Sequence, residues 1–175
     1  MQADILPSRP PASPPPKKAD HLAAWRHTVE ALRQVASACP PGVRVSLEPK
    51  PTDAVTRWSI APNTAAALLL VREVDLPGVG LTLDFGHMLA AGENPAASIA
   101  LAASAGKLFG LHLNDGYTRA GAEDGLAFAS VSEAAALEAV RWLQRLRWDG
   151  YIYFDTFPLK EASDGELLEP LCTCT

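Results

Sequence analysis

Cysteine is scarce in this sequence, and it has no long apolar run. The chain has three cysteines, Cys39, Cys172 and Cys174. Their number is odd, and there is no second cysteine pair to complete a zinc ligand set. A reducing, cytoplasmic location is the simplest interpretation of that usage. The longest aliphatic run, 65–71, is far too short to cross a bilayer, and no basic segment followed by an apolar stretch opens the chain. We therefore expect no disulfide framework and no membrane partner.

Positive charge is also in short supply. The chain has 20 acidic and 15 basic residues, which gives a net charge of −5 at pH 7. This balance disfavours a phosphate backbone as a partner, so we expect no nucleic acid ligand. It suits instead a small neutral substrate, or cations that are held by carboxylates.

Apolar residues and, near the start, proline are abundant. Hydrophobic residues make up 48% of the 175, which is enough for one sizeable core in a single domain. Residues 1–19 include six prolines and are predicted to form a disordered Pro-rich tail, because they cannot bury enough apolar surface to fold. Residues 20–160 form the predicted domain, and 161–175 an irregular C-terminal segment.

Helical and strand patterns alternate along the domain. They predict helices over 20–39, 63–74, 95–106 and 132–147, and strands over 43–48, 79–84, 107–113 and 151–155. Asp20 and Asn94 are the expected caps of the first and third helices. The last helix is expected to bury Leu137, Val140, Leu143 and Leu146. The order predicts an α/β fold with a parallel sheet, since strands joined through helices run in the same direction.

Each of the four strands ends on a residue that can bind a metal: Glu48, Asp84, His112 and Asp155. Parallel strands place all their carboxyl ends at one edge of the sheet, so these side chains should converge. Three carboxylates and one imidazole are mostly hard oxygen donors, which favour manganese, magnesium or cobalt. The sequence therefore predicts a divalent metal site.

A second cation could lie beside the first. His87 stands three residues after Asp84 and can reach that position, while Glu123 and Asp124, in the loop after the third strand, are candidate partners for it.

Five groups of motifs occur in order between about 20 and 160. They are Glu48-Pro-Lys-Pro51; Leu83-Asp-Phe-Gly-His87 with Ala91-Gly-Glu-Asn94; Gly106-Lys-Leu-Phe109 leading to His112-Leu-Asn114; Glu123-Asp-Gly-Leu126; and Phe154-Asp-Thr-Phe-Pro158. As a set they resemble the xylose-isomerase-like superfamily. The closest similarity is to its sugar isomerase and epimerase branch, which includes rhamnose isomerase and tagatose epimerase.

The resemblance implies a (β/α)₈ TIM barrel. With four strands and flanking helices, this chain would be a parallel (β/α) half-barrel corresponding to strands 5–8. A small sugar would be the substrate. The expected partner is a second copy in a homodimer, or a separate amino-terminal half, because half a barrel leaves two sheet edges unpaired.

The resemblance also implies roles for individual residues. Glu48, Asp84, His112 and Asp155 would bind a divalent metal, most simply manganese, with cobalt, magnesium or zinc as alternatives. His87 and Asp124 would hold a second or mobile metal. Lys50 would lie next to the carbonyl oxygen of the substrate, and Glu48 and Asp155 would act as general base and acid in the epimerase variant.

Two functional hypotheses follow. The first is a metal-dependent sugar isomerase or epimerase, which interconverts an aldose and a ketose or epimerises a ketose. The alternative is a catalytically incompetent half-barrel that binds metal. The sequence does not decide between these two hypotheses. It also does not decide whether the reaction would proceed by a hydride shift or by proton exchange.

Overall fold

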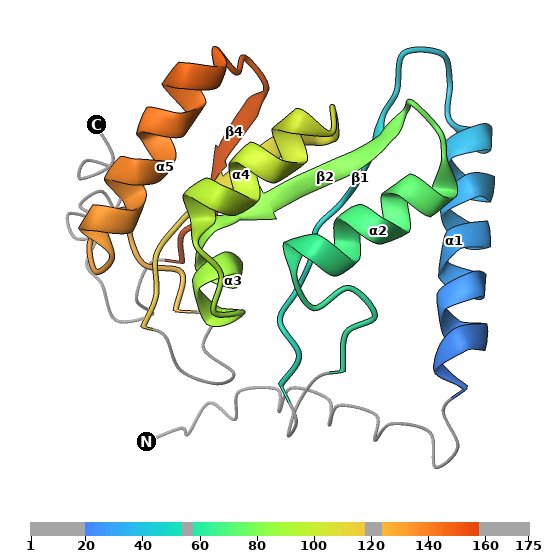
Figure 1. The fold of residues 1–175 in the computed structure, drawn as a ribbon, viewed down its shortest axis with the longest axis horizontal. Coiled ribbons are helices and arrows are strands. Elements are labelled where there is room, and N and C mark those ends of the chain that lie inside the picture. The colour runs from blue at the N-terminus through green and yellow to red at the C-terminus, as the bar shows by residue number, and fades with distance from the viewer. Residues whose placement is uncertain (1–19, 54–57, 118–123, 158–175) are drawn as a thin grey trace, which may run out of the picture.

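The computed structural model describes residues 20–53, 58–117 and 124–157. The segments predicted as a Pro-rich tail (1–19) and as an irregular C-terminal stretch (161–175) lie outside the described residues. Helices and strands alternate as predicted except for one additional helix after the second strand, and Figure 1 shows their arrangement. The helices are α1 (His21–Ala38), α2 (Thr64–Val74), α3 (Phe85–Ala90), α4 (Pro95–Ser104) and α5 (Glu133–Leu146). The strands are β1 (Val45–Leu47), β2 (Val79–Asp84), β3 (Leu108–Leu113) and β4 (Tyr151–Phe154).

The four strands form one parallel sheet in the order β1-β2-β3-β4. This confirms the α/β class and the four-stranded parallel arrangement. Figure 1 shows α2 and α4 lying across one face of the sheet. Because all strands point the same way, their carboxyl ends share one edge of the sheet, and β2 and β3 lie at its centre.

Side chains of β2 and β3 that face the helices form the centre of the core. Leu81, Leu83 and Leu111 are at most 1% exposed and pack with Leu70 and Ile99 from α2 and α4. Burial of each such side chain contributes on the order of 1.5–3 kcal/mol. The core therefore fixes the two central strands, and with them the residues at their carboxyl ends.

Side-chain caps start four of the helices. Asp20, Asn63 and Asn94 each accept a hydrogen bond from the backbone N–H three residues later, at the starts of α1, α2 and α4. This confirms the caps expected at Asp20 and Asn94. Asp84 makes the same bond to the N–H of His87, which starts α3.

The helix α3 was not predicted from the sequence. Its six residues follow β2 without a loop, between the predicted strand over 79–84 and the predicted helix over 95–106. The cause is Asp84, which ends the strand and caps the helix with the same carboxylate. This helix matters for the site because it carries His87 back over the end of β2.

The buried face of α5 differs from the prediction. Leu137 and Leu146 are 49% and 36% exposed, whereas Ala136 and Ala139 are buried. The neighbouring helix α4 is rich in alanine, and small residues on both helices let them approach closely. The buried face of α5 is therefore determined by its close contact with α4, and not by the positions of its largest apolar side chains.

None of the described helices is long and apolar enough to span a membrane.

Candidate metal centre

The centre of the site is Asp84, the last residue of β2. Its side chain is completely buried, and each carboxylate oxygen accepts one hydrogen bond from the protein. Oδ1 accepts from the backbone N–H of His87 at 2.8 Å, and Oδ2 accepts from the Asn114 amide at 2.8 Å. The orientation of this carboxylate is therefore fixed from two sides.

His112, near the end of β3, places its Nδ1 atom among three carboxylates. That nitrogen lies 3.6 Å from Glu48 Oε2, 3.9 Å from Asp84 Oδ2 and 3.8 Å from Asp155 Oδ2. One carboxylate oxygen thus comes from the end of each of the other three strands. The convergence expected from parallel topology is present for all four side chains.

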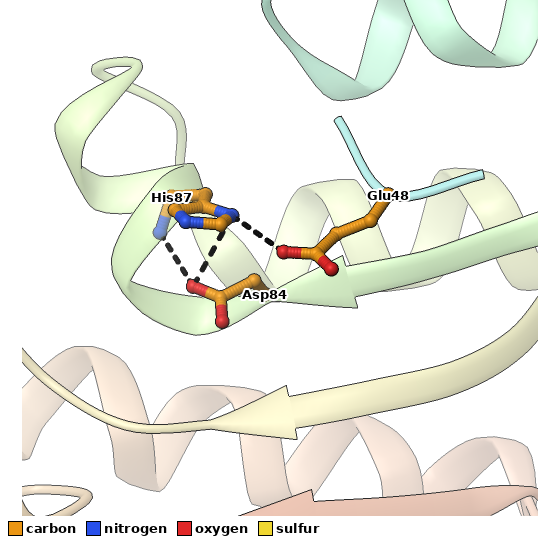
Figure 2. Close-up of side chains that lie close together, drawn as sticks. All are labelled: Glu48, Asp84 and His87. Carbon is orange, nitrogen blue, oxygen red and sulfur yellow. Dashed lines mark hydrogen bonds and ion pairs between the residues drawn. The ribbon is translucent and has the colours of Figure 1, made fainter. Parts of the chain in front are cut away.

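His87 approaches the same carboxylates from α3. Figure 2 shows its ring facing the carboxylates of both Glu48 and Asp84, with Nδ1 3.0 Å from Glu48 Oε1 and 3.6 Å from Asp84 Oδ1. The side chains therefore form two overlapping groups, Glu48–Asp84–His87 and Asp84–His112–Asp155. In each, donor atoms lie within 4.8 Å of one another, and Asp84 belongs to both.

The chemistry of these groups fits a divalent cation. The Nδ1 atoms of His87 and His112 are buried, and carboxylate oxygens face both of them, at 3.0 Å from His87 and 3.6 Å from His112. A neutral imidazole nitrogen without a proton is an acceptor, and the carboxylates around it are acceptors too, so only a proton or a cation can lie favourably between them. Donor atoms bound to one cation at about 2.1 Å are about 3.0–3.4 Å apart. The observed spacings of 3.6–3.9 Å around His112 are close to that range.

The two most central carboxylates have pKa values shifted in opposite directions. The interaction with the His87 ring lowers the pKa of Glu48, and it outweighs burial, which acts the other way. Burial raises the pKa of Asp84, and the nearby His87 opposes that effect only in part. A positive charge between them would favour the ionised form of both.

The remaining predicted site residues, Lys50 and Asp124, line the pocket next to these groups. The same pocket is bounded by Asp84, His87 and Asp155. Asp124 belongs to neither ligand group, and its Oδ2 accepts a hydrogen bond from the N–H of Tyr117 at 2.8 Å. Its role as a second metal ligand stays a prediction. Glu123 lies outside the described residues.

The sequence predictions gave no role in the site to Asn114 and Asp115, two buried polar residues that follow β3. Asn114 contacts Asp84, as described above. Asp115 is 1% exposed, and its Oδ2 accepts hydrogen bonds from the N–H groups of Val131 and Ser132 at the start of α5. Their position directly after a predicted strand could have indicated a role, because the carboxyl ends of the parallel strands carry the site.

A family comparison places this geometry in context. Residues 2–168 match the family model described as a xylose isomerase-like TIM barrel. The chain belongs to this family. A xylose isomerase from Thermus thermophilus is 33% identical over 145 residues, which cover 80% of this chain and 37% of that protein. The resemblance inferred from the motifs is thereby confirmed.

Solved structures of sugar epimerases share the fold. 3-Keto-D-glucoside 4-epimerase from E. coli superposes with a TM-score of 0.72 at 18% identity, over 91% of this chain and 56% of that one. D-Psicose 3-epimerase from Clostridium cellulolyticum H10 superposes with a TM-score of 0.70 at 20% identity, over 90% of this chain and 56% of that one. The chain therefore spans about half the length of these barrels, and its four parallel strands with flanking helices form a half-barrel.

Proposed function

We propose that this chain acts as a half-barrel form of a divalent-metal-dependent sugar isomerase or epimerase in the cytoplasm. The single observation that supports it is the cluster around His112 Nδ1, where carboxylates from the three other strand ends surround a buried imidazole nitrogen. Family membership supports the proposed reaction class, and sugar epimerases share the fold.

The proposed first site uses Glu48, Asp84, His112 and Asp155 as ligands, with manganese as the expected metal. His87 is positioned to contribute to a neighbouring second site. When bound, such a cation would act as a Lewis acid toward the carbonyl and hydroxyl oxygens of a sugar.

The chain's own residues supply the remaining chemistry. Glu48 and Asp155 directly follow β1 and β4, the two outer strands, so their carboxylates approach His112 from opposite sides of the sheet order. For epimerisation we assign one of them the removal of the proton from the sugar carbon next to the carbonyl, and the other the return of a proton to the opposite face of that carbon, as general base and acid. Lys50, in the pocket wall, would donate a hydrogen bond to the carbonyl oxygen. A direct hydride shift between the carbons is the alternative route.

We further propose that a second copy of the chain completes the mouth of the site. All four residues of β4 are exposed, from 38% at Phe154 to 78% at Tyr151, although they are apolar or aromatic. An exposed apolar edge strand favours pairing with another strand. If a two-fold axis along the barrel axis relates the two copies, β4 of each copy pairs with β1 of the other, and all eight strands remain parallel.

An activity screen tests the reaction class. The purified chain with added manganese is incubated with rhamnose, xylose, tagatose and psicose, and products are separated by chromatography. We expect turnover from the paired form and little or none from the monomer, since positioning around the whole mouth accounts for roughly 7–11 kcal/mol of barrier reduction. The matched control is Lys50→Met, which should lose turnover and keep metal binding. Metal binding without turnover in any assembly would support the incompetent half-barrel instead.

A further inference from the structure

We propose that Asn114 is a positioning residue that holds the Asp84 carboxylate in its metal-binding orientation and thereby sets metal affinity. This inference rests on the proposed metal centre. Asn114 follows β3 directly, is 6% exposed, and was not among the residues expected to form the site.

The Asn114 amide connects the ends of the two central strands. Its Nδ2 donates to Asp84 Oδ2 at 2.8 Å, and its Oδ1 accepts from the backbone N–H of Gly86 at 2.8 Å. The carboxylate can only accept and the backbone N–H can only donate, so chemistry dictates which end of the amide faces which partner. Both ends are satisfied in the observed orientation and neither would be if the amide were turned over.

This bond determines what Asp84 can offer to a cation. Oδ1 is held by the N–H of His87 and Oδ2 by Asn114, which leaves a further acceptor site on each oxygen. Those oxygens lie 3.6 Å from His87 Nδ1 and 3.9 Å from His112 Nδ1. Without Asn114, Asp84 Oδ2 would lose its hydrogen-bond donor. Only the bond from the N–H of His87 to Oδ1 would then oppose rotation of the carboxylate.

The absence of a side chain at Gly86 is part of the same arrangement. A Cβ at this position would lie 2.8 Å from Asn114 Oδ1, so any other residue would displace the amide. Gly86→Ala should therefore weaken metal binding by the same mechanism as Asn114→Ala, although residue 86 contributes no side chain to the site.

The test is calorimetric titration of the full chain with Mn²⁺, supported by the visible absorption spectrum of the Co²⁺ complex. We expect Asn114→Ala to raise the Kd about 10- to 100-fold, the usual effect of removing a partner that orients a metal ligand. The Co²⁺ spectrum should change as well, because the orientation of one ligand is released. Gly86→Ala should act in the same direction, and adding it to Asn114→Ala should weaken binding little further.

Asn94→Ala is a matched control. Asn94 also accepts one backbone N–H, from Ala97, and donates to one carboxylate, that of Glu138, but Glu138 belongs to neither ligand group. Both asparagine variants should lower the melting temperature in EDTA, whereas only Asn114→Ala should change Kd and the spectrum.

Two results would overturn the assignment. If Asp84→Ala abolishes binding while Asn114→Ala and Gly86→Ala bind Mn²⁺ as the wild type does, the metal centre stands and the role of Asn114 is wrong. If Asp84→Ala itself binds as the wild type does, the metal centre fails and this inference fails with it.

Discussion

An aspartate of the proposed site ends the central strand β2, and another directly follows the edge strand β4, but the surroundings of the two strands differ sharply. In β2, Leu81, Leu83 and Asp84 are fully buried. In β4 every residue is exposed, and the side chain of Asp155 is still 32% exposed. The site thus has one half that the core holds in place and another half that lies on an open edge.

This contrast indicates that the two aspartates are held in place in different ways. Asp84 is oriented by the core, by the first turn of α3 and by Asn114, so its position needs nothing outside the chain. Asp155 is held through the backbone of β4, whose N–H at that residue donates to Leu113. We expect the β2 side to determine folding and metal affinity, and the β4 side to depend on what pairs with it.

The largest contrast should appear in core stability. Leu83→Ala on β2 should lower the free energy of unfolding by about 2–5 kcal/mol, because the side chain is buried and leaves a cavity. Ile152→Ala on β4, where the side chain is 51% exposed, should cost less than about 1 kcal/mol in the monomer. Urea unfolding at low protein concentration measures both. Equal losses would show that β4 is as well packed as β2.

The next contrast concerns the two aspartates as metal ligands. At a manganese concentration of about 100 times Kd, binding should stabilise the wild-type chain by about 2.7 kcal/mol. Asp84→Ala should remove this stabilisation completely, since Asp84 belongs to both ligand groups. Asp155→Ala leaves the group Glu48–Asp84–His87 intact, so we expect binding about tenfold weaker, equivalent to about 1.4 kcal/mol.

Thermal unfolding with and without manganese measures this difference. An unchanged melting temperature of the wild type at millimolar metal would count against the site, and identical behaviour of the two variants would count against the division between β2 and β4.

The smallest effect on monomer stability is expected at the open edge. Tyr151→Lys, at a position that is 78% exposed, should change the free energy of unfolding by no more than about 0.5 kcal/mol. Self-association should nevertheless fall, because a charged residue on an edge strand opposes pairing with another strand. Sedimentation velocity over a range of concentrations tests this, with Leu137→Lys on the exposed face of α5 as a control. A wild-type chain that stays monomeric throughout would refute pairing through β4.

Much of the fold followed from local patterns. Alternation and helical spacing located all four strands and the four longer helices, because each pattern reflects which face of an element is buried. Helix α3 was missed, since six residues carry too little periodicity and its start depends on the side chain of Asp84. The exposed Leu137 was also missed, because its environment depends on how closely α4 packs against α5.

The sequence by itself determined that Glu48, Asp84, His112 and Asp155 would meet, because parallel strands joined by helices bring their carboxyl ends to one edge. Only the tertiary structure decided how they meet. In the folded chain, His87 contacts Glu48, and Asn114 donates a hydrogen bond to Asp84 across 30 positions of the sequence. Strand β4 lies at the edge of the sheet. Those relations depend on side-chain direction and on distances between segments far apart in sequence, which no local pattern encodes.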